Sequence, residues 1–161
     1  MQLKSFLTPL TTEILEQAIE QELHASHLYR HLANQCQRLG LFGAQKYFKA
    51  ESADELTHYE RIVDFINDRG SVAETPTIES IATEVTSLKD ALEAGYEAEV
   101  ALGAKYADWY KKTVTVEPIT GQFLLQFLEI QNKSIGEYAD LLQRLDLGGD
   151  ILVFDNELGS K

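Results

Sequence analysis

Five side chains in this sequence are of types that bind metal ions, and their spacing places them on the faces of helices. Glu55 and His58 lie three residues apart, so they project from the same helix face. Glu22, Glu99 and Gln131 each interrupt a largely apolar heptad pattern. Carboxylate oxygens with one imidazole suit iron or manganese better than zinc or copper. Because Glu-x-x-His is typical of dinuclear carboxylate centres in helix bundles, this set predicts a site for two metal ions.

Four long helical segments, separated by glycine and proline, carry these residues. We expect the segments, followed by a short fifth helix, at about 10–38, 43–69, 87–114, 118–146 and 150–158. Breaks coincide with Gly40, Gly70 and Gly148, and Pro118 suits the first turn of a helix. Thr11 or Thr12, with Glu16 behind, is expected to cap the first helix, and Ser87 the third. No stretch alternates with the period of two that strands require, so the chain is predicted to be all-α.

The connection between the second and third segments is long enough to cross the whole bundle. Helices of about 27 residues span about 40 Å, whereas the sixteen residues over 71–86 reach about 53 Å. The third helix can therefore start at the far end and run parallel to the second. The other connections are short and give antiparallel hairpins, so the prediction is a four-helix bundle with one long crossover.

Each long helix is predicted to present one polar ligand from its core-facing seam. In the fourth helix this seam comprises Leu124, Leu128, Gln131, Ile135, Tyr138, Leu142 and Leu145. Glu22 and Glu55 are equidistant from the first glycine break, and Glu99 and Gln131 are equidistant from the proline break. Residues equidistant from a hairpin turn lie at the same height. All four helices therefore point a ligand toward one level near the middle of the bundle.

The equal height of these four polar residues favours a metal site over a chance occurrence of polar residues in the seams. A single Glu in a seam usually reaches solvent, and Glu-x-x-His recurs by chance in helices. Three carboxylates buried near one point are different, because each costs several kcal/mol unless it is compensated. The seams contain no Lys or Arg to pair with them. A pair of cations would compensate all three, whereas a purely structural bundle leaves them unexplained.

Composition excludes several classes of protein. The chain of 161 residues carries a formal net charge of −12, which makes nucleic acid and membrane surfaces poor partners. The only cysteine, Cys36, rules out an internal disulfide or a thiolate zinc cluster and suits a reducing compartment. No signal peptide or membrane-spanning run is evident. We expect a single domain over residues 1–161 in a cytoplasmic protein.

At the residues already named, the chain resembles a ferritin of the non-haem bacterial type. The segment ELHASHLY, from Glu22 to Tyr29, resembles the family's first-helix pattern E-x-x-x-S-x-x-Y. DELTH, which ends at His58, resembles its E-E-x-x-H pattern, and YEAE, which ends at Glu99, resembles its third-helix ligand segment. Gln131 falls where the family has Gln or Glu, and VFDNEL near the end resembles the family's C-terminal segment. The likeness covers nearly the whole chain.

The resemblance implies a ferritin-like fold and a ferroxidase that stores iron. Such a protein oxidises Fe(II) with O2 or peroxide and moves the ferric product into the cavity of a shell of 24 identical subunits. Two irons per subunit are implied, without haem. The first iron would be bound by Glu22, Glu55 and His58. The second would be bound by a bridging Glu55 and by Glu99. Gln131 would ligate the second iron weakly or hold the oxidant, and Tyr29 would hydrogen-bond a ligand or supply an electron.

The sequence also departs from the family pattern. Ile130, Lys133 and Ser134 stand where many bacterial ferritins have glutamates, so a third iron site of the usual composition is not expected. Ser134 also replaces the His of a second Glu-x-x-His. The only Met is Met1, and Leu56 occupies the position of a haem-binding Met. The resemblance further places Glu117 near threefold channels, where it could guide Fe(II).

Two rival functions share the bundle. One is a diiron peroxide reductase or oxidase that does not store iron, from which a ferritin would be distinguished by its assembly size. The other is a DNA-protecting mini-ferritin of twelve subunits with metal between subunits. The intra-bundle ligands and the net charge of −12 oppose this second alternative.

Overall fold

Five helices account for most of the chain in the computed structural model, which describes residues 1–161. They are α1 (Pro9–Arg38), α2 (Phe42–Asp68), α3 (Leu88–Thr113), α4 (Pro118–Asp146) and α5 (Ile151–Leu158). The all-α prediction is confirmed, and each helix end lies within one residue of its predicted position. Gly40 and Gly70, just after α1 and α2, have positive φ angles of 79° and 85°, a conformation that glycine adopts readily. None of the five helices combines the length and hydropathy that a membrane span requires.

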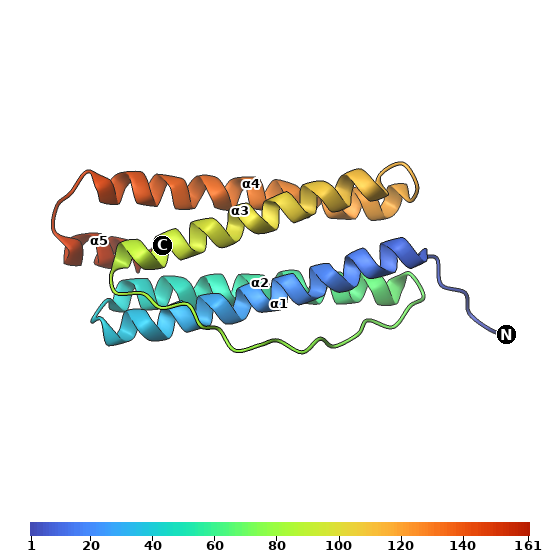
Figure 1. Ribbon diagram of the computed structural model, residues 1–161, viewed down its shortest axis with the longest axis horizontal. Helices are drawn as coiled ribbons and strands as arrows, with labels where there is room; N and C mark the ends of the chain where they lie inside the picture. The colour runs from blue at the N-terminus through green and yellow to red at the C-terminus, as the bar shows by residue number, and fades with distance from the viewer.

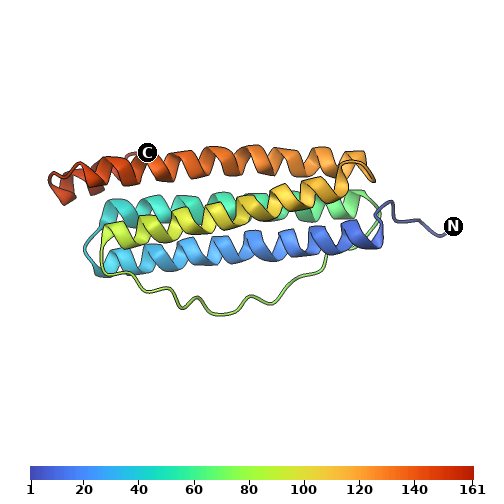
Figure 2. The same cartoon turned by 45° about the horizontal axis from the view of Figure 1, so that its top comes forward.

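The long connection crosses the bundle as expected (Figure 1). It leaves the end of α2, runs along the outer side of α1 and returns the chain to the opposite end, where α3 begins parallel to α2 (Figure 2). Gln35 of α1 holds the last part of this connection, because its side-chain oxygen accepts a hydrogen bond of 2.7 Å from the backbone N–H of Val85. Ser87 then caps α3 by accepting from the N–H of Asp90 at 3.1 Å, which confirms the predicted cap.

The predicted cap of α1 is wrong by three residues or more. Thr8, not Thr11 or Thr12, is the N-cap, and Pro9 takes the first helical position. Thr8 and Thr11 form the reciprocal capping box, in which each side chain accepts from the other's backbone N–H. Glu16 takes no part in the box, and its Oε1 instead accepts a hydrogen bond of 3.3 Å from a backbone N–H of the crossover.

Two apolar clusters fill the bundle and leave a polar layer between them. Leu32, Phe48 and Leu92 belong to the cluster nearer α5, whereas Ile19 and Ile62 belong to the other. Burying apolar side chains on both sides gives the folding free energy that a polar middle layer cannot supply. The polar layer is therefore fixed in position by its apolar neighbours.

The seam predicted for α4 is only partly correct. Phe127 and Leu141 are buried, whereas Leu128 and Leu142, which the heptad pattern placed in the core, are partly exposed. A straight α-helix drifts by about 20° per heptad from a strict repeat of seven. One extended heptad pattern therefore does not describe the buried face of a helix as long as α4.

Glu117 joins the N-terminal ends of α1 and α4. Its side chain is buried and accepts a hydrogen bond of 2.8 Å from the hydroxyl of Thr11 and another from the hydroxyl of Thr120. Both carboxylate oxygens are thus engaged inside the chain. This contact gives Glu117 a structural role that its sequence position did not reveal.

Asp155 of α5 caps the N-terminus of α2. Leu41, the N-cap of α2, offers no side-chain hydrogen bond. The Asp155 carboxylate instead accepts from the backbone N–H of Gly43 at 2.9 Å and of Ala44 at 2.7 Å. A Cβ atom at position 43 would collide with the backbone of Asp155, so this close approach requires glycine. The short C-terminal helix is therefore fastened to the start of α2.

Replacing Asp155 by Ala should destabilise the protein by about 1 kcal/mol, the usual cost of losing an N-cap side chain. We also expect α5 to be cleaved more rapidly by protease, since its polar anchor is lost. Urea unfolding and limited proteolysis measure the two effects. The exposed neighbour Asn156, replaced by Ala, is the control and should change neither. Equal stability of the Asp155 variant and the native chain would contradict the capping role.

Candidate metal centre

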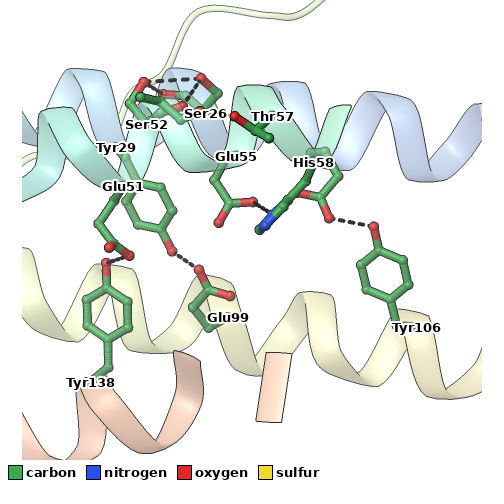
Figure 3. A network of polar contacts seen from close by, with 12 residues as sticks. Ser26, Tyr29, Glu51, Ser52, Glu55, Thr57, His58, Glu99, Tyr106 and Tyr138 are labelled. Atoms are coloured by element: carbon green, nitrogen blue, oxygen red, sulfur yellow. Dashed lines mark hydrogen bonds and ion pairs between the residues drawn. The ribbon is translucent and has the colours of Figure 1, made fainter. Parts of the chain in front are cut away.

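Glu22 of α1 meets Glu55 and His58 of α2 in the polar layer, and Figure 3 shows the latter two side by side. The Nδ1 atom of His58 lies 3.2 Å from a carboxylate oxygen of Glu55 and 3.5 Å from one of Glu22. One ligand atom from each residue lies within 4.8 Å of the others. The two glutamates are only 0% and 3% exposed. The equal height predicted for Glu22 and Glu55 is thus present in the structure.

A pair of serines fixes the register of α1 against α2 beside this cluster. Ser26 lies one turn after Glu22, and Ser52 lies three residues before Glu55. Each serine hydroxyl donates a hydrogen bond of 2.7 Å to the backbone carbonyl oxygen of the other (Figure 3). Side chains this small let the two backbones approach closely. The reciprocal pair therefore holds the two glutamates at the same level.

Glu99 of α3 and Gln131 of α4 occupy the same layer and have buried side-chain atoms without a hydrogen-bond partner. Both side chains are 1% exposed. One oxygen of Glu99 accepts from the hydroxyl of Tyr29, but its Oε2 has no partner, and neither amide atom of Gln131 has one. A buried polar atom without a partner costs about 1–3 kcal/mol. These atoms are therefore suited to a ligand that the protein chain does not itself provide.

Two tyrosines connect the hairpins through hydrogen bonds that run in opposite directions. Tyr29 of α1 donates to Glu99 of α3, and Tyr106 of α3 donates to Oε1 of Glu22 at 2.5 Å (Figure 3). The role of Tyr106 was missed from the sequence. A signal was present, because Tyr29 follows Glu22 by seven residues and Tyr106 follows Glu99 by the same spacing. Each tyrosine thus orients a carboxylate on the opposite helix.

Aromatic rings support His58 from α4. The ring of Phe127 meets the imidazole edge to face, with centroids 5.8 Å apart, and stacks on Tyr106 at 5.4 Å. The guanidinium of Arg61 lies over the Phe127 ring, 4.8 Å from its centre. Packing of this kind limits the rotation of His58, so that its Nδ1 stays directed toward the carboxylates.

The cluster holds protons when no metal is bound. Burial and the adjacent Glu22 carboxylate raise the pKa of Glu55 well above its ordinary value. Burial opposes a charge on His58, but hydrogen bonds to Glu22 and Glu55 outweigh it and raise the pKa of the imidazole to about 10. Burial raises the pKa of Glu22 too, but the hydrogen bonds to Glu55 and His58 outweigh it, so the pKa of Glu22 is lowered. Burial raises the pKa of Glu99 to about 7.

Three carboxylates and one imidazole nitrogen form a donor set for hard or borderline cations such as iron or manganese. Glu22, Glu55 and His58 make the tight group, and Glu99 and Gln131 come from the opposite hairpin without joining it. Position 134, three residues after Gln131, carries serine, so the α4 side offers no second imidazole. Position 133 carries an exposed lysine, which pairs with Glu137 at 3.8 Å, so this position adds no carboxylate to the layer.

Comparison with known proteins agrees with this architecture. The family described as "Ferritin-like domain" matches residues 12–148. The chain belongs to the ferritin family. Haemophilus influenzae has a relative described as a "Probable bacterial non-heme ferritin-like protein", 26% identical over 159 residues and covering 96% of each chain. A "Bacterial non-heme ferritin" from Escherichia coli is 25% identical over 144 residues, covering 89% of this chain and 87% of the relative.

A solved structure confirms the ferritin-like four-helix fold. An open-pore ferritin from the archaeon Archaeoglobus fulgidus superposes with a TM-score of 0.91 and covers 96% of this chain and 98% of its own. Its sequence is 24% identical, so this likeness concerns the fold alone.

Binding of a divalent cation at pH 7 should release about one proton per chain from His58, whose pKa of about 10 keeps it protonated there, because ligands bind deprotonated. Metal affinity should accordingly rise with pH. A pH-indicator titration with Zn(II), or with Fe(II) under anaerobic conditions, measures the release. His58→Ala should reduce the number released, whereas the exposed His24→Ala should not. Metal binding without proton release would contradict a protonated His58 in the metal-free chain.

Proposed function

We propose that this ferritin-family protein oxidises Fe(II) at the buried centre, using O2 or peroxide, and stores the ferric product inside a shell of 24 chains. The observation that best supports an oxidation site is the convergence of buried carboxylates within one layer. Glu22, Glu55 and His58 lie within 4.8 Å, and the free oxygen of Glu99 faces the same layer. Negatively charged carboxylates stabilise Fe(III) more than Fe(II), because Fe(III) carries the larger positive charge. Burying three carboxylates in one layer therefore promotes oxidation.

Fe(II) is the substrate in this proposal, and each residue has a defined part. Glu22, Glu55 and His58 bind the first ion, and His58 first gives up its proton so that Nδ1 can donate its lone pair. Glu55 bridges to the second ion, which Glu99 also binds. Gln131 ligates that ion weakly or holds the oxidant through its amide. Tyr106 keeps one oxygen of Glu22 engaged and so directs the other toward the metal.

The electrons balance with either oxidant. Two Fe(II) ions supply two electrons, which reduce one peroxide to two waters or hydroxides or reduce one O2 to peroxide. The protein supplies positioning and a fixed negative field, and it excludes water with the apolar clusters on either side. Oxidation then needs little rearrangement of the ligands.

Loss of a ligand should slow the fast phase of Fe(II) oxidation by at least about 100-fold, more than the effect usual for residues that only support metal ligands. Glu22→Ala and His58→Ala test this in stopped-flow absorbance measurements of Fe(III). Glu20, exposed on the same helix two residues away, provides Glu20→Ala as the matched control at native rate. Oxidation at the native rate in both ligand variants would show that the centre is assigned wrongly.

Storage is tested by assembly and iron content together. Twenty-four chains of 18.1 kDa give a particle of about 430 kDa. After aerobic addition of excess Fe(II), size exclusion with absorbance at two wavelengths should show ferric iron and protein eluting together at that size. A small oligomer retaining about two irons per chain would overturn storage and favour the alternative, a diiron peroxide reductase or oxidase on the same bundle.

A further inference from the structure

Three of the four histidines in the chain lie in α1, outside the buried centre. His24, His27 and His31 follow one another at spacings of three and four residues, whereas His58 belongs to the carboxylate cluster. His27 and His31, one turn apart, project from the same helix face with Cβ atoms about 5–6 Å from each other. Two histidines at this spacing bind one zinc ion in the helical motif His-Glu-x-x-His. The pair therefore has the spacing at which both imidazoles can bind the same ion.

The long crossover forms a surface cavity with this face of α1. It runs beside α1 in both views of the molecule (Figures 1 and 2). His27 and His31 line a cavity of about 450 Å³ together with crossover residues that include Ile78, Glu79 and Ile81. A water molecule occupies about 30 Å³, so the cavity has room for a metal ion that keeps several of its waters.

The crossover also orients the imidazole of His31. The Nε2 atom of His31 lies 2.8 Å from the carbonyl oxygen of Thr83. A carbonyl oxygen only accepts, so Nε2 carries the proton in this contact and Nδ1 keeps its lone pair. The side-chain amide of Gln35 lies beside the same Nε2 and donates to the same oxygen, which holds the three groups together. Histidines that bind metals commonly donate their other ring N–H to a carbonyl oxygen in this way.

Glu79 offers a carboxylate from the other side of the cavity. It is exposed and belongs to the crossover, whereas both histidines belong to α1. Arg30 also lines the cavity, but it is exposed, and its long side chain can keep the charge in water. Two imidazoles with one carboxylate favour zinc, copper or nickel, unlike the carboxylate-rich set in the middle of the bundle.

We propose that His27 and His31, together with Glu79, bind one divalent transition-metal ion of the zinc and copper class at the surface. The ion joins α1 to the crossover and so fastens the longest connection of the chain at a point between its two ends. This site is separate from the cluster of the middle layer, and it does not depend on the proposed oxidation of Fe(II).

The test is to titrate the assembled protein with Cu(II) and to count the bound imidazole nitrogens by pulsed electron paramagnetic resonance. The buried centre contains only one imidazole, so Cu(II) coupled to two of them identifies the surface site. We expect two in the native protein. We also expect two in His58→Ala, which removes the imidazole of the buried centre.

Variants of the two histidines assign the nitrogens. His27→Ala and His31→Ala should each leave one imidazole and weaken Cu(II) binding at this site by at least about tenfold, the smallest loss usual when a partner of a metal ligand is removed. His24→Ala, exposed on the same helix, is the matched control and should bind as the native protein does. Arg30→Gln should strengthen binding, because it removes a positive charge beside the ion.

Proteolysis tests the contact with the crossover. Zn(II) should slow subtilisin cleavage within residues 71–86 of the native protein, whereas Glu79→Gln should lose this protection. Glu84→Gln, exposed on the same crossover but outside the cavity, should keep it. An unrelated peptide substrate measures any direct effect of Zn(II) on the protease.

Two results would overturn the assignment. Cu(II) coupled to no more than one imidazole in both the native protein and His58→Ala would show that no such site exists. Equal affinity and two imidazoles in His27→Ala or His31→Ala would show that other residues bind the ion. Protection by Zn(II) that persists unchanged in Glu79→Gln would remove this carboxylate from the site.

Discussion

Buried negative charge in the middle of the bundle is the constraint on which the rest of the structure depends. Glu22, Glu55 and Glu99 are removed from water without a lysine or arginine beside them. Such groups are stable only if protons, hydroxyl donors or cations offset their charge. His58, together with tyrosine hydroxyls, offsets part of it in the metal-free chain. The remaining negative charge is what the proposed cations would offset.

The apolar clusters and the tyrosine–glutamate hydrogen bonds between α1 and α3 stabilise this charged layer in different ways. The clusters lie on either side of the layer and stabilise the helices that carry it. Tyr29 and Tyr106 cross between α1 and α3 in opposite directions, which gives the layer an approximate twofold symmetry. The symmetry ends at α2 and α4, where His58 has serine as its counterpart at position 134. The two halves of the layer are therefore chemically unequal, with an imidazole nitrogen available on one side alone.

Much of the fold and the approach of Glu22 to Glu55 could be predicted because both follow from short-range rules. Helix ends follow glycine and proline, and the height of a residue in a hairpin follows from its distance to the turn. The features that were missed depend on contacts across the fold. Glu117 binds Thr11, and Asp155 binds the N-terminus of α2, each over more than 100 residues. No local pattern encodes such pairs.

The cap that Asp155 provides has a consequence for the order of folding during synthesis. Gly43 and Ala44 leave the ribosome 112 and 111 residues before the carboxylate that satisfies their N–H groups. Until α5 has been made, the N–H groups at the start of α2 therefore have no side-chain acceptor. A chain that stops short of α5 therefore lacks the carboxylate that caps the start of α2. Formation of α5 and completion of the first helix pair are thus linked.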